Sequence, residues 1–243
     1  MKKLILMPVA GAAAACSMTV AAATINLNTG ASGSGWQVKQ TSGTANSTVG
    51  LNVEGHAVVL TGTLPFAANL PGFEAFAWSN PFGGAIWVGQ LATDGQFSNG
   101  GAITCGSPCG ATAGDYVYTH SFAAGAGGSL VLSGFTGDNG VRSLTVMQGA
   151  TELYGCSAGG PGLLCAGTQT SVTASTGTLS FAAGSDIVIT VLVQNLDGPG
   201  RNPSGFILAG SAEVAAVPEP STMAMMLAGL LGVVGLVGRR RPR

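Results

Sequence analysis

Residues 187–193 read Ile187-Val188-Ile189-Thr190-Val191-Leu192-Val193, and this run decides the fold class. All of these residues except Leu192 are β-branched, which is typical of strands. Only Thr190 interrupts the apolar side chains. A run that is apolar at almost every position predicts a central strand that is buried on both faces.

Shorter runs of the same kind recur along the chain between clusters of Gly, Asn, Asp and Pro, which mark turns. These runs are His56–Leu60, Ala85–Val88, Tyr116–His120, Ser129–Ser133, Ser143–Met147, Thr178–Phe181 and Phe206–Ala209. Gly137-Asp138-Asn139-Gly140 is predicted to be a turn between two strands, because Asp, Asn and Gly tolerate positive φ. The pattern predicts an all-β fold of two antiparallel sheets packed face to face. The strand spacing leaves both a β-sandwich and a jelly roll open.

The composition favours a β-rich exported protein over a helical bundle. The chain has 243 residues, of which 40 are glycine and only 8% are charged. Long apolar runs occur only near its two ends, and Gly, Ser, Thr, Ala and Asn are frequent between them. Residues 24–216 are numerous enough for one β domain with its own core.

Residues 1–23 have the features of a secretory signal peptide, which passes through the secretion translocon and is removed by signal peptidase. A lysine pair precedes an apolar segment over Leu4–Val20, and Ala21-Ala22-Ala23 forms an A-x-A cleavage site. Cleavage after Ala23 makes Thr24 the first mature residue. A retained N-terminal anchor and a lipoprotein site at Ala13-Ala14-Ala15-Cys16 are the alternatives.

The predicted body, residues 24–216, is acidic. It contains three basic and nine acidic residues, which give a net charge of −6. This balance excludes nucleic acid as a partner, because no basic patch is present to neutralise phosphates. Divalent cations or neutral sugars fit this body better.

Four cysteines remain after cleavage, and an even number in an oxidising compartment predicts two disulfides. They are Cys105, Cys109, Cys156 and Cys165. Gly and Pro fill the intervening loops, which favours the local pairs Cys105–Cys109 and Cys156–Cys165 among the three pairings. A four-cysteine zinc site is the alternative, but the C-x₃-C and C-x₈-C spacings differ from the C-x-x-C pairs of such sites, so no metal site is predicted at the cysteines.

The final segment, residues 217–243, has three parts. Two prolines flank Glu219 and prevent a helix from starting earlier. Thr222–Gly238 is then apolar apart from Thr222, and its 17 residues lie near the lower limit for a transmembrane helix. Arginines at positions 239–241 and 243 would stay cytoplasmic and leave the body outside.

These three parts resemble the PEP-CTERM sorting signal of Gram-negative bacteria. The residues that carry the resemblance are Val217, Pro218, Glu219, Pro220, Ser221, Thr222, Arg239, Arg240 and Arg241. The resemblance implies that an exosortase, an integral-membrane cysteine transpeptidase, cuts near Pro218-Glu219-Pro220 after transient membrane anchoring. It also implies export across the inner membrane to the cell surface or medium, in association with exopolysaccharide and biofilm. An ordinary C-terminal anchor would leave the two prolines unexplained.

The body is similar to galactose-binding-like jelly rolls in the order of its motifs. The matching segments include Phe135–Val141, Val191–Asn195 and Pro203–Phe206. The chain departs from that pattern at Met147-Gln148-Gly149, where Asn-Gly is common, and at Ser185-Asp186, where Asn is usual. The resemblance implies a jelly roll and leaves its sugar site in doubt.

No catalytic constellation is evident, so the chain is predicted to be a non-enzymatic protein without a cofactor. Gly155-Cys156-Ser157-Ala158-Gly159 matches G-x-S-x-G, but Gly160-Pro161-Gly162 cannot start the required helix well and no histidine follows. The acids are dispersed along the chain. A secreted polysaccharide-active hydrolase, whose carboxylates only the fold would bring together, is the alternative.

Two further features concern ligands. Trp78 is predicted to be exposed and able to stack on a sugar ring, whereas Trp36 and Trp87 are predicted core residues. Asp138 and Asn139 could hold a structural calcium, although ordinary turn chemistry is the alternative. A structural or carbohydrate-associated role in the exopolysaccharide matrix is the predicted function of the body.

Overall fold

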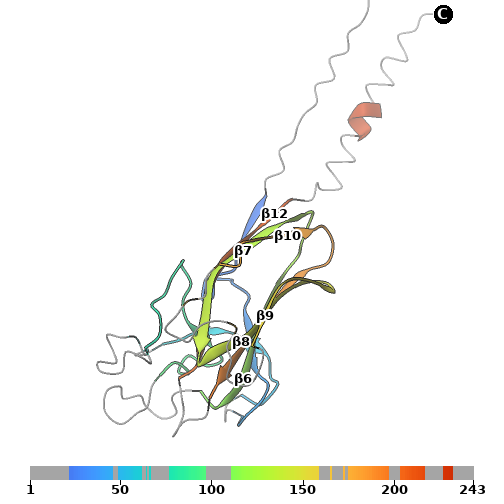
Figure 1. Ribbon diagram of the computed structural model, residues 1–243. Coiled ribbons are helices and arrows are strands. Elements are labelled where there is room, and N and C mark those ends of the chain that lie inside the picture. The colour runs from blue at the N-terminus through green and yellow to red at the C-terminus, as the bar shows by residue number, and fades with distance from the viewer. Residues whose placement is uncertain are drawn as a thin grey trace, which may run out of the picture. The chain divides into compact units, whose positions relative to one another are not determined.

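The computed structural model divides the chain into two units. One unit is the body, Ala22–Val217, and the other comprises Met1–Ala21 and Pro218–Arg243. The structure describes residues 22–45, 49–61, 64, 66, 77–96, 111–158, 165, 172, 175–196, 203–216 and 227–231. The body consists of two antiparallel sheets, A and B (Figure 1).

The ends of the chain were predicted to be helical. Residues 227–231 form a short helix, and none of the helical residues that the structure describes belongs to a helix long and apolar enough to cross a membrane. The predicted signal helix and the rest of the predicted transmembrane helix lie outside the described residues.

Sheet A has β12 at its centre, because this strand pairs with β7 along one side and with β5 and β1 along the other. Its strand order is β10-β7-β12-β5-β4, with β1 attached to the far end of β12. The strands are β1 (Ala23–Asn26), β4 (Val58–Val59), β5 (Val88–Gly89), β7 (Gly127–Asp138), β10 (Thr178–Ala182) and β12 (Gly205–Val214).

Sheet B has β11 inside it, between β6 and β8, and its order is β3-β2-β6-β11-β8-β9. The strands are β2 (Gln37–Gln40), β3 (Gly55–His56), β6 (Gly114–Phe122), β8 (Gly140–Gln148), β9 (Thr151–Ser157) and β11 (Ile187–Asn195). From β6 to β12 the chain stays in one sheet only at the β8–β9 connection and otherwise crosses between sheets. These crossing connections join the two sheets into one sandwich.

The main core lies between the sheets and is lined by alternate residues of their strands. In β11, Ile187, Ile189, Val191 and Val193 are fully buried. Phe206 of β12 meets them from sheet A, with its ring centroid 5.0 Å from that of Tyr118 and 5.4 Å from that of Trp36. Trp36 is held in place by an indole N–H that donates to the Leu27 carbonyl at 2.9 Å.

The strand at 187–193 is central, as predicted, but the prediction that both its faces are buried was wrong. Exposed or half-buried residues alternate with buried ones along β11, and Val188 is 36% exposed. Strand β12 is buried on both faces over part of its length, where Phe206, Ile207, Leu208 and Ala209 are all at most 1% exposed. The physical reason is that residues from the segment before β6 cover the outer face of sheet A over this part of β12.

This cover forms a second, smaller core. Ile207 and Ala209 pack on the outer face of β12 against buried side chains that precede β6 in the sequence. Those side chains are Leu60, Trp78, Ala85 and Trp87. The segment between β3 and β6 was predicted to supply only two strands, and it also supplies a hydrophobic layer.

All eight strand-like runs overlap strands of the structure. The run His56–Leu60 is divided between β3 and β4, and Ala85–Val88 meets β5 only at Val88. Strands β1, β2 and β9 were not predicted. Their sequences, ATIN, QVKQ and TELYGCS, carry too few apolar residues for periodicity to reveal them.

The predicted turn at residues 137–140 is confirmed, since only Asn139 separates β7 from β8. The two strands belong to different sheets, so the turn carries the chain across the sandwich. It does not close a hairpin.

Val191→Ala should lower the free energy of unfolding by about 2–3 kcal/mol, because it leaves a cavity in the main core. Val188→Ala is the matched control on the other face of the same strand and should lower it by less than about 1 kcal/mol. Urea unfolding followed by fluorescence measures both values. Equal losses would contradict the one-sided burial of β11.

Candidate functional site

Trp78 is buried, so the prediction of an exposed sugar-stacking residue was wrong. Its side chain is 3% exposed and stacks on Trp87, with ring centroids 4.2 Å apart and planes inclined by 26°. Burial of two large aromatic surfaces stabilises the cover on sheet A. The ring has no face available to a sugar.

The Trp78 indole N–H donates to the Asp138 carboxylate, with 2.8 Å between Nε1 and Oδ2. Asp138 is 4% exposed, and its other oxygen, Oδ1, has no hydrogen-bond partner within the described chain. Burial raises the pKa of Asp138 from 3.8 to about 7, although the hydrogen bond from Trp78 lowers it in part. The Ser204 hydroxyl donates to the backbone carbonyl of Asp138 at 3.1 Å. This turn is therefore anchored in a poorly solvated pocket.

Asn139 uses its side-chain oxygen within the protein, where it accepts a hydrogen bond from the Leu196 N–H at 2.7 Å. Among residues that the structure describes, no three His, Cys, Asp or Glu side chains are grouped as a metal centre requires. Calcium binding at Asp138 and Asn139 stays a prediction.

A second buried carboxylate lies in the same region of the body. Asp94 is 2% exposed, and its Oδ2 accepts a hydrogen bond from the Leu91 N–H at 2.7 Å. The Ser204 N–H donates to the Asp94 backbone carbonyl at 2.9 Å, so Ser204 bonds to the backbone of both Asp94 and Asp138. Burial, and to a smaller extent the charge of Asp94, raises the pKa of Tyr118 well above its usual value. Both acids are closed to solvent and to a substrate.

The first three residues of the G-x-S-x-G segment lie on a strand. Gly155, Cys156 and Ser157 are in β9, and Cys156 forms a disulfide. His56 contacts the side-chain amide of Gln37 at 2.8 Å, and His120 packs against Trp36 with ring centroids 5.3 Å apart. The described residues of this segment do not provide the base that a nucleophilic serine needs.

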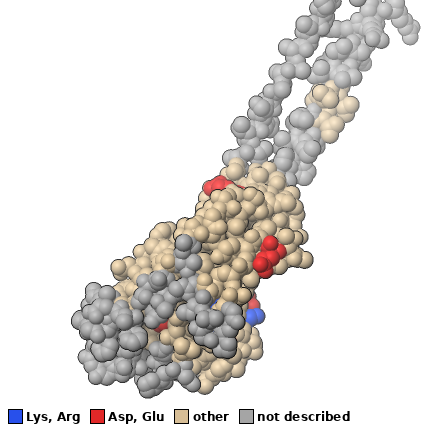
Figure 2. All heavy atoms as spheres, viewed as in Figure 1, with Lys and Arg blue, Asp and Glu red and all other residues tan. Residues whose placement is uncertain are grey.

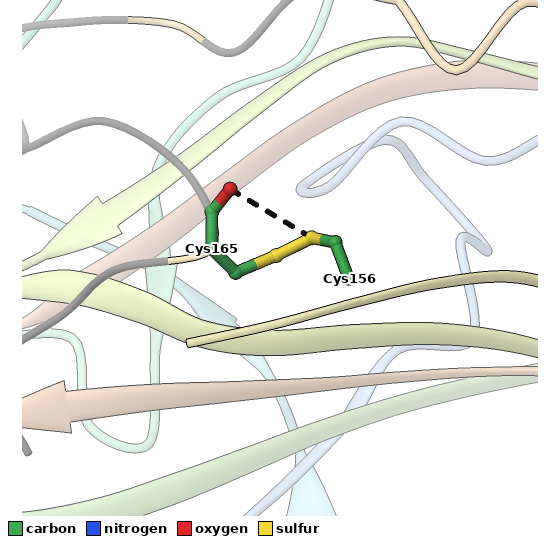
Figure 3. The surroundings of a disulfide bond; sticks show 2 residues. All are labelled: Cys156 and Cys165. Atoms are coloured by element: carbon green, nitrogen blue, oxygen red, sulfur yellow. Dashed lines mark hydrogen bonds between the residues drawn. A yellow bond between two sulfur atoms is a disulfide. The ribbon is translucent and has the colours of Figure 1, made fainter. Parts of the chain in front are cut away.

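Cys156 and Cys165 are joined by a disulfide, as predicted (Figure 3). Their Cα atoms lie 5.5 Å apart, an ordinary separation for such a bond. Two residues beside this disulfide also bond through their backbones to the start of β8: Cys165 N–H donates to the Val141 carbonyl at 2.8 Å and Ala158 N–H to that of Arg142 at 2.9 Å. Cys105 and Cys109 lie outside the described residues, so their pairing stays a prediction.

The two basic side chains that the structure describes in the body contact different partners and do not form a cluster with each other. Lys39 Nζ lies 3.7 Å from Glu54 Oε2, and Arg142 donates to the Gln194 side chain at 3.0 Å. The face of the body in view in Figure 2 carries few charged side chains. A polyanion therefore finds no basic patch among these residues.

The C-terminal segment was compared with known families. The last strand of the body, β12, ends at Val214, and residues 216–241 match the family described as PEP-CTERM protein-sorting motif. The chain carries a PEP-CTERM sorting motif. The PEP-CTERM match includes the predicted sorting residues from Val217 to Thr222 and Arg239 to Arg241, which lie outside the described residues. No curated protein and no solved structure matches the chain.

The PEP-CTERM motif implies an exosortase as the processing partner and export across the inner membrane toward the cell surface. The sequence alone located it, because proline, apolar and arginine blocks are consecutive along the chain. The buried Trp78–Asp138 pair was not found in this way. The two residues are 60 positions apart, and the sequence contains no signal that links them.

Asp138→Asn should remove a pH dependence of stability. Between pH 4 and 7 the unfolded chain ionises at Asp138 while the folded chain keeps its proton, so the free energy of unfolding falls as pH rises and levels off above about 7. The rise in the pKa of Asp138 from 3.8 to about 7 corresponds to about 4 kcal/mol of unfolding free energy. Urea unfolding from pH 4 to pH 8 should therefore show a fall in the wild type that is largely absent in the variant.

Trp78→Phe keeps an aromatic ring at this position and removes the indole N–H donor, so it should make the loss of stability above pH 7 larger. Parallel pH curves for the wild type and Asp138→Asn would contradict a buried, proton-binding Asp138.

Replacing both Cys156 and Cys165 with Ser should lower the free energy of unfolding by about 2–3 kcal/mol, because the open loop gives the unfolded chain more conformational entropy. Ser157→Ala, on the same strand, is the control and should have little effect. Urea unfolding without a reductant gives both values. A loss no larger than that of the control would show that the disulfide does not stabilise the fold.

Proposed function

We propose that this chain is an exported, exosortase-processed protein whose β-sandwich has a non-enzymatic role in the exopolysaccharide matrix, either structural or carbohydrate-associated. Residues 1–23 act as its signal peptide in this proposal. The C-terminal segment anchors it transiently in the membrane until exosortase cuts. The sorting motif at residues 216–241 is the single observation that carries the proposal.

The position of the motif supports processing of a folded body. Strand β12 ends at Val214, and the proposed cut near Pro218-Glu219-Pro220 lies beyond it. The cut therefore removes no residue of the two cores and breaks no pairing of β12. The body can fold first and keep its structure after release.

The N-terminal side of the body is compatible with the same scheme. Ala23 pairs with Val214, and the Thr24 hydroxyl donates to the Glu213 carboxylate at 2.8 Å. The described body thus begins and ends on neighbouring strands of sheet A. Signal-peptide cleavage after Ala23 leaves Thr24 and nearly all of β1 in the mature protein.

The non-enzymatic part of the proposal is supported by the placement of the titratable side chains. Asp94 and Asp138 are buried away from substrate, and His120 is buried beside Trp36. Burial lowers the pKa of His120 below its ordinary value, so at neutral pH its ring is uncharged. These groups therefore lie in the interior of the sandwich.

Deleting the exosortase gene should leave the C-terminal segment on the protein and keep it with the membrane. In the parent strain the mature protein should have an intact mass that begins at Thr24 and ends close to Pro218-Glu219-Pro220. Replacing Pro218 and Pro220 with Ala should reproduce the effect of the deletion. Mass spectrometry of membrane and secreted fractions measures both.

Leu227→Ile keeps the apolar character of the tail and is the matched control, with processing unchanged. An identical mass and location of the protein in the parent and deletion strains would contradict processing by exosortase. A mature protein that releases sugars from neutral polysaccharide would instead establish the hydrolase alternative.

A further inference from the structure

A shallow groove of about 380 Å³ lies on the outer face of sheet A, beside the hydrophobic cover. Among the described residues that line it, five carry a hydroxyl or an amide group on the side chain and none is charged. These five are Thr24, Asn26, Asn28, Ser133 and Ser211. The volume lies in the range of ordinary ligand sites.

Strand register places these polar groups in rows. Asn26 of β1 lies directly opposite Ser211 of β12, which lies opposite Val131 of β7 on its other side. Directly opposed residues on one face of a sheet are about 5 Å apart. The row therefore places two hydrogen-bonding side chains, on β1 and β12, side by side and next to Val131 of β7.

The wall of the groove is fixed by internal hydrogen bonds. The Asn28 amide donates to the Gly83 carbonyl at 2.8 Å, and its oxygen accepts from the Gly210 N–H at 2.9 Å. Both glycines are required here. A Cβ on Gly83, whose φ is +57°, would lie 2.8 Å from the Ala209 Cβ, and one on Gly210 would lie 2.8 Å from the Val131 carbonyl oxygen. The site is therefore preorganised.

Two lining groups are left for a ligand. The Ser211 hydroxyl and Nδ2 of Asn26 make no hydrogen bond with any part of the chain that the structure describes, although Oδ1 of Asn26 accepts from the Asn28 N–H. A hydroxyl both donates and accepts, and an amide nitrogen donates. Glu213, which borders the row, is already bonded to Thr24.

We propose that this groove binds a short stretch of an uncharged polysaccharide, an inference that deepens the proposed matrix role and rests on it. Sugar hydroxyls donate and accept hydrogen bonds at close intervals and so match the row. The lining residues that the structure describes include no cationic group, which an anionic ligand needs. Their one large apolar side chain, Val131, is too little for a lipid or an apolar peptide.

The test uses the full chain, purified from a strain without exosortase in a detergent that has no sugar headgroup. Native electrophoresis through gels containing dextran, galactomannan, a soluble β-glucan or alginate measures binding as retardation. At least one of the three neutral polymers should retard the protein, and alginate should not.

The test variant combines Asn26→Asp, which keeps the acceptor for Asn28 and removes the free donor, with Ser211→Ala. It should weaken binding roughly tenfold, because two hydrogen bonds are lost. The control combines Thr178→Ala with Ser180→Ala, which lie on β10 and are absent from the groove lining, and should bind within about twofold of the wild type. Ser211→Tyr, which fills the groove, provides an independent test if the double variant unfolds.

Absence of retardation by every neutral polymer, retardation by alginate alone, or equal binding by the wild type and the groove variants would each overturn the proposal. None of these results alters the intact mass of the processed protein, so the sorting role is judged separately. Binding that persists in the groove variants would place a sugar site elsewhere and leave the carbohydrate-associated role intact.

Discussion

Phe206 sits at the centre of sheet A and packs against Trp36 and Tyr118 of the opposite side, with ring centroids 5.4 and 5.0 Å away. This contact fixes β12 over the middle of sheet B. Because β12 then pairs with β7 on one side and with β1 and β5 on the other, its position determines that of most of sheet A. A chain with only 8% charged residues depends on such apolar and aromatic contacts to select one arrangement of its sheets.

The outward face of β12 carries the second, smaller core. Ile207 and Ala209 point away from the main core and are covered by Trp78 and Trp87. The cover shields Asp138 from water, which raises the pKa of its carboxyl to about 7. Beyond the cover the outer face of sheet A is open and polar, and there the glycines and asparagines shape the groove. The outer face of sheet A is thus apolar where it is covered and polar where it is open.

Periodicity predicted eight strand-like runs correctly, because each contains several β-branched or aromatic residues in succession. It failed for β1, β2 and β9, whose positions in the fold are set by pairing with neighbours rather than by apolar side chains. Trp78 was assigned to the surface because its sequence neighbours resemble a loop. Its burial results from Trp87, Asp138 and β12, and none of these contacts is local in sequence.

The sequence by itself determined the sorting motif, the all-β class, the acidic body and the disulfide between Cys156 and Cys165. Each depends on composition or on residues close together in the chain. Only the tertiary structure decided that β12 is buried on both faces over part of its length, where Trp78 and Asp138 lie, and that β1, β7 and β12 contribute to a polar groove. Those features arise from residues up to 187 positions apart, such as Thr24 and Ser211, and long-range strand pairing is what brings them together.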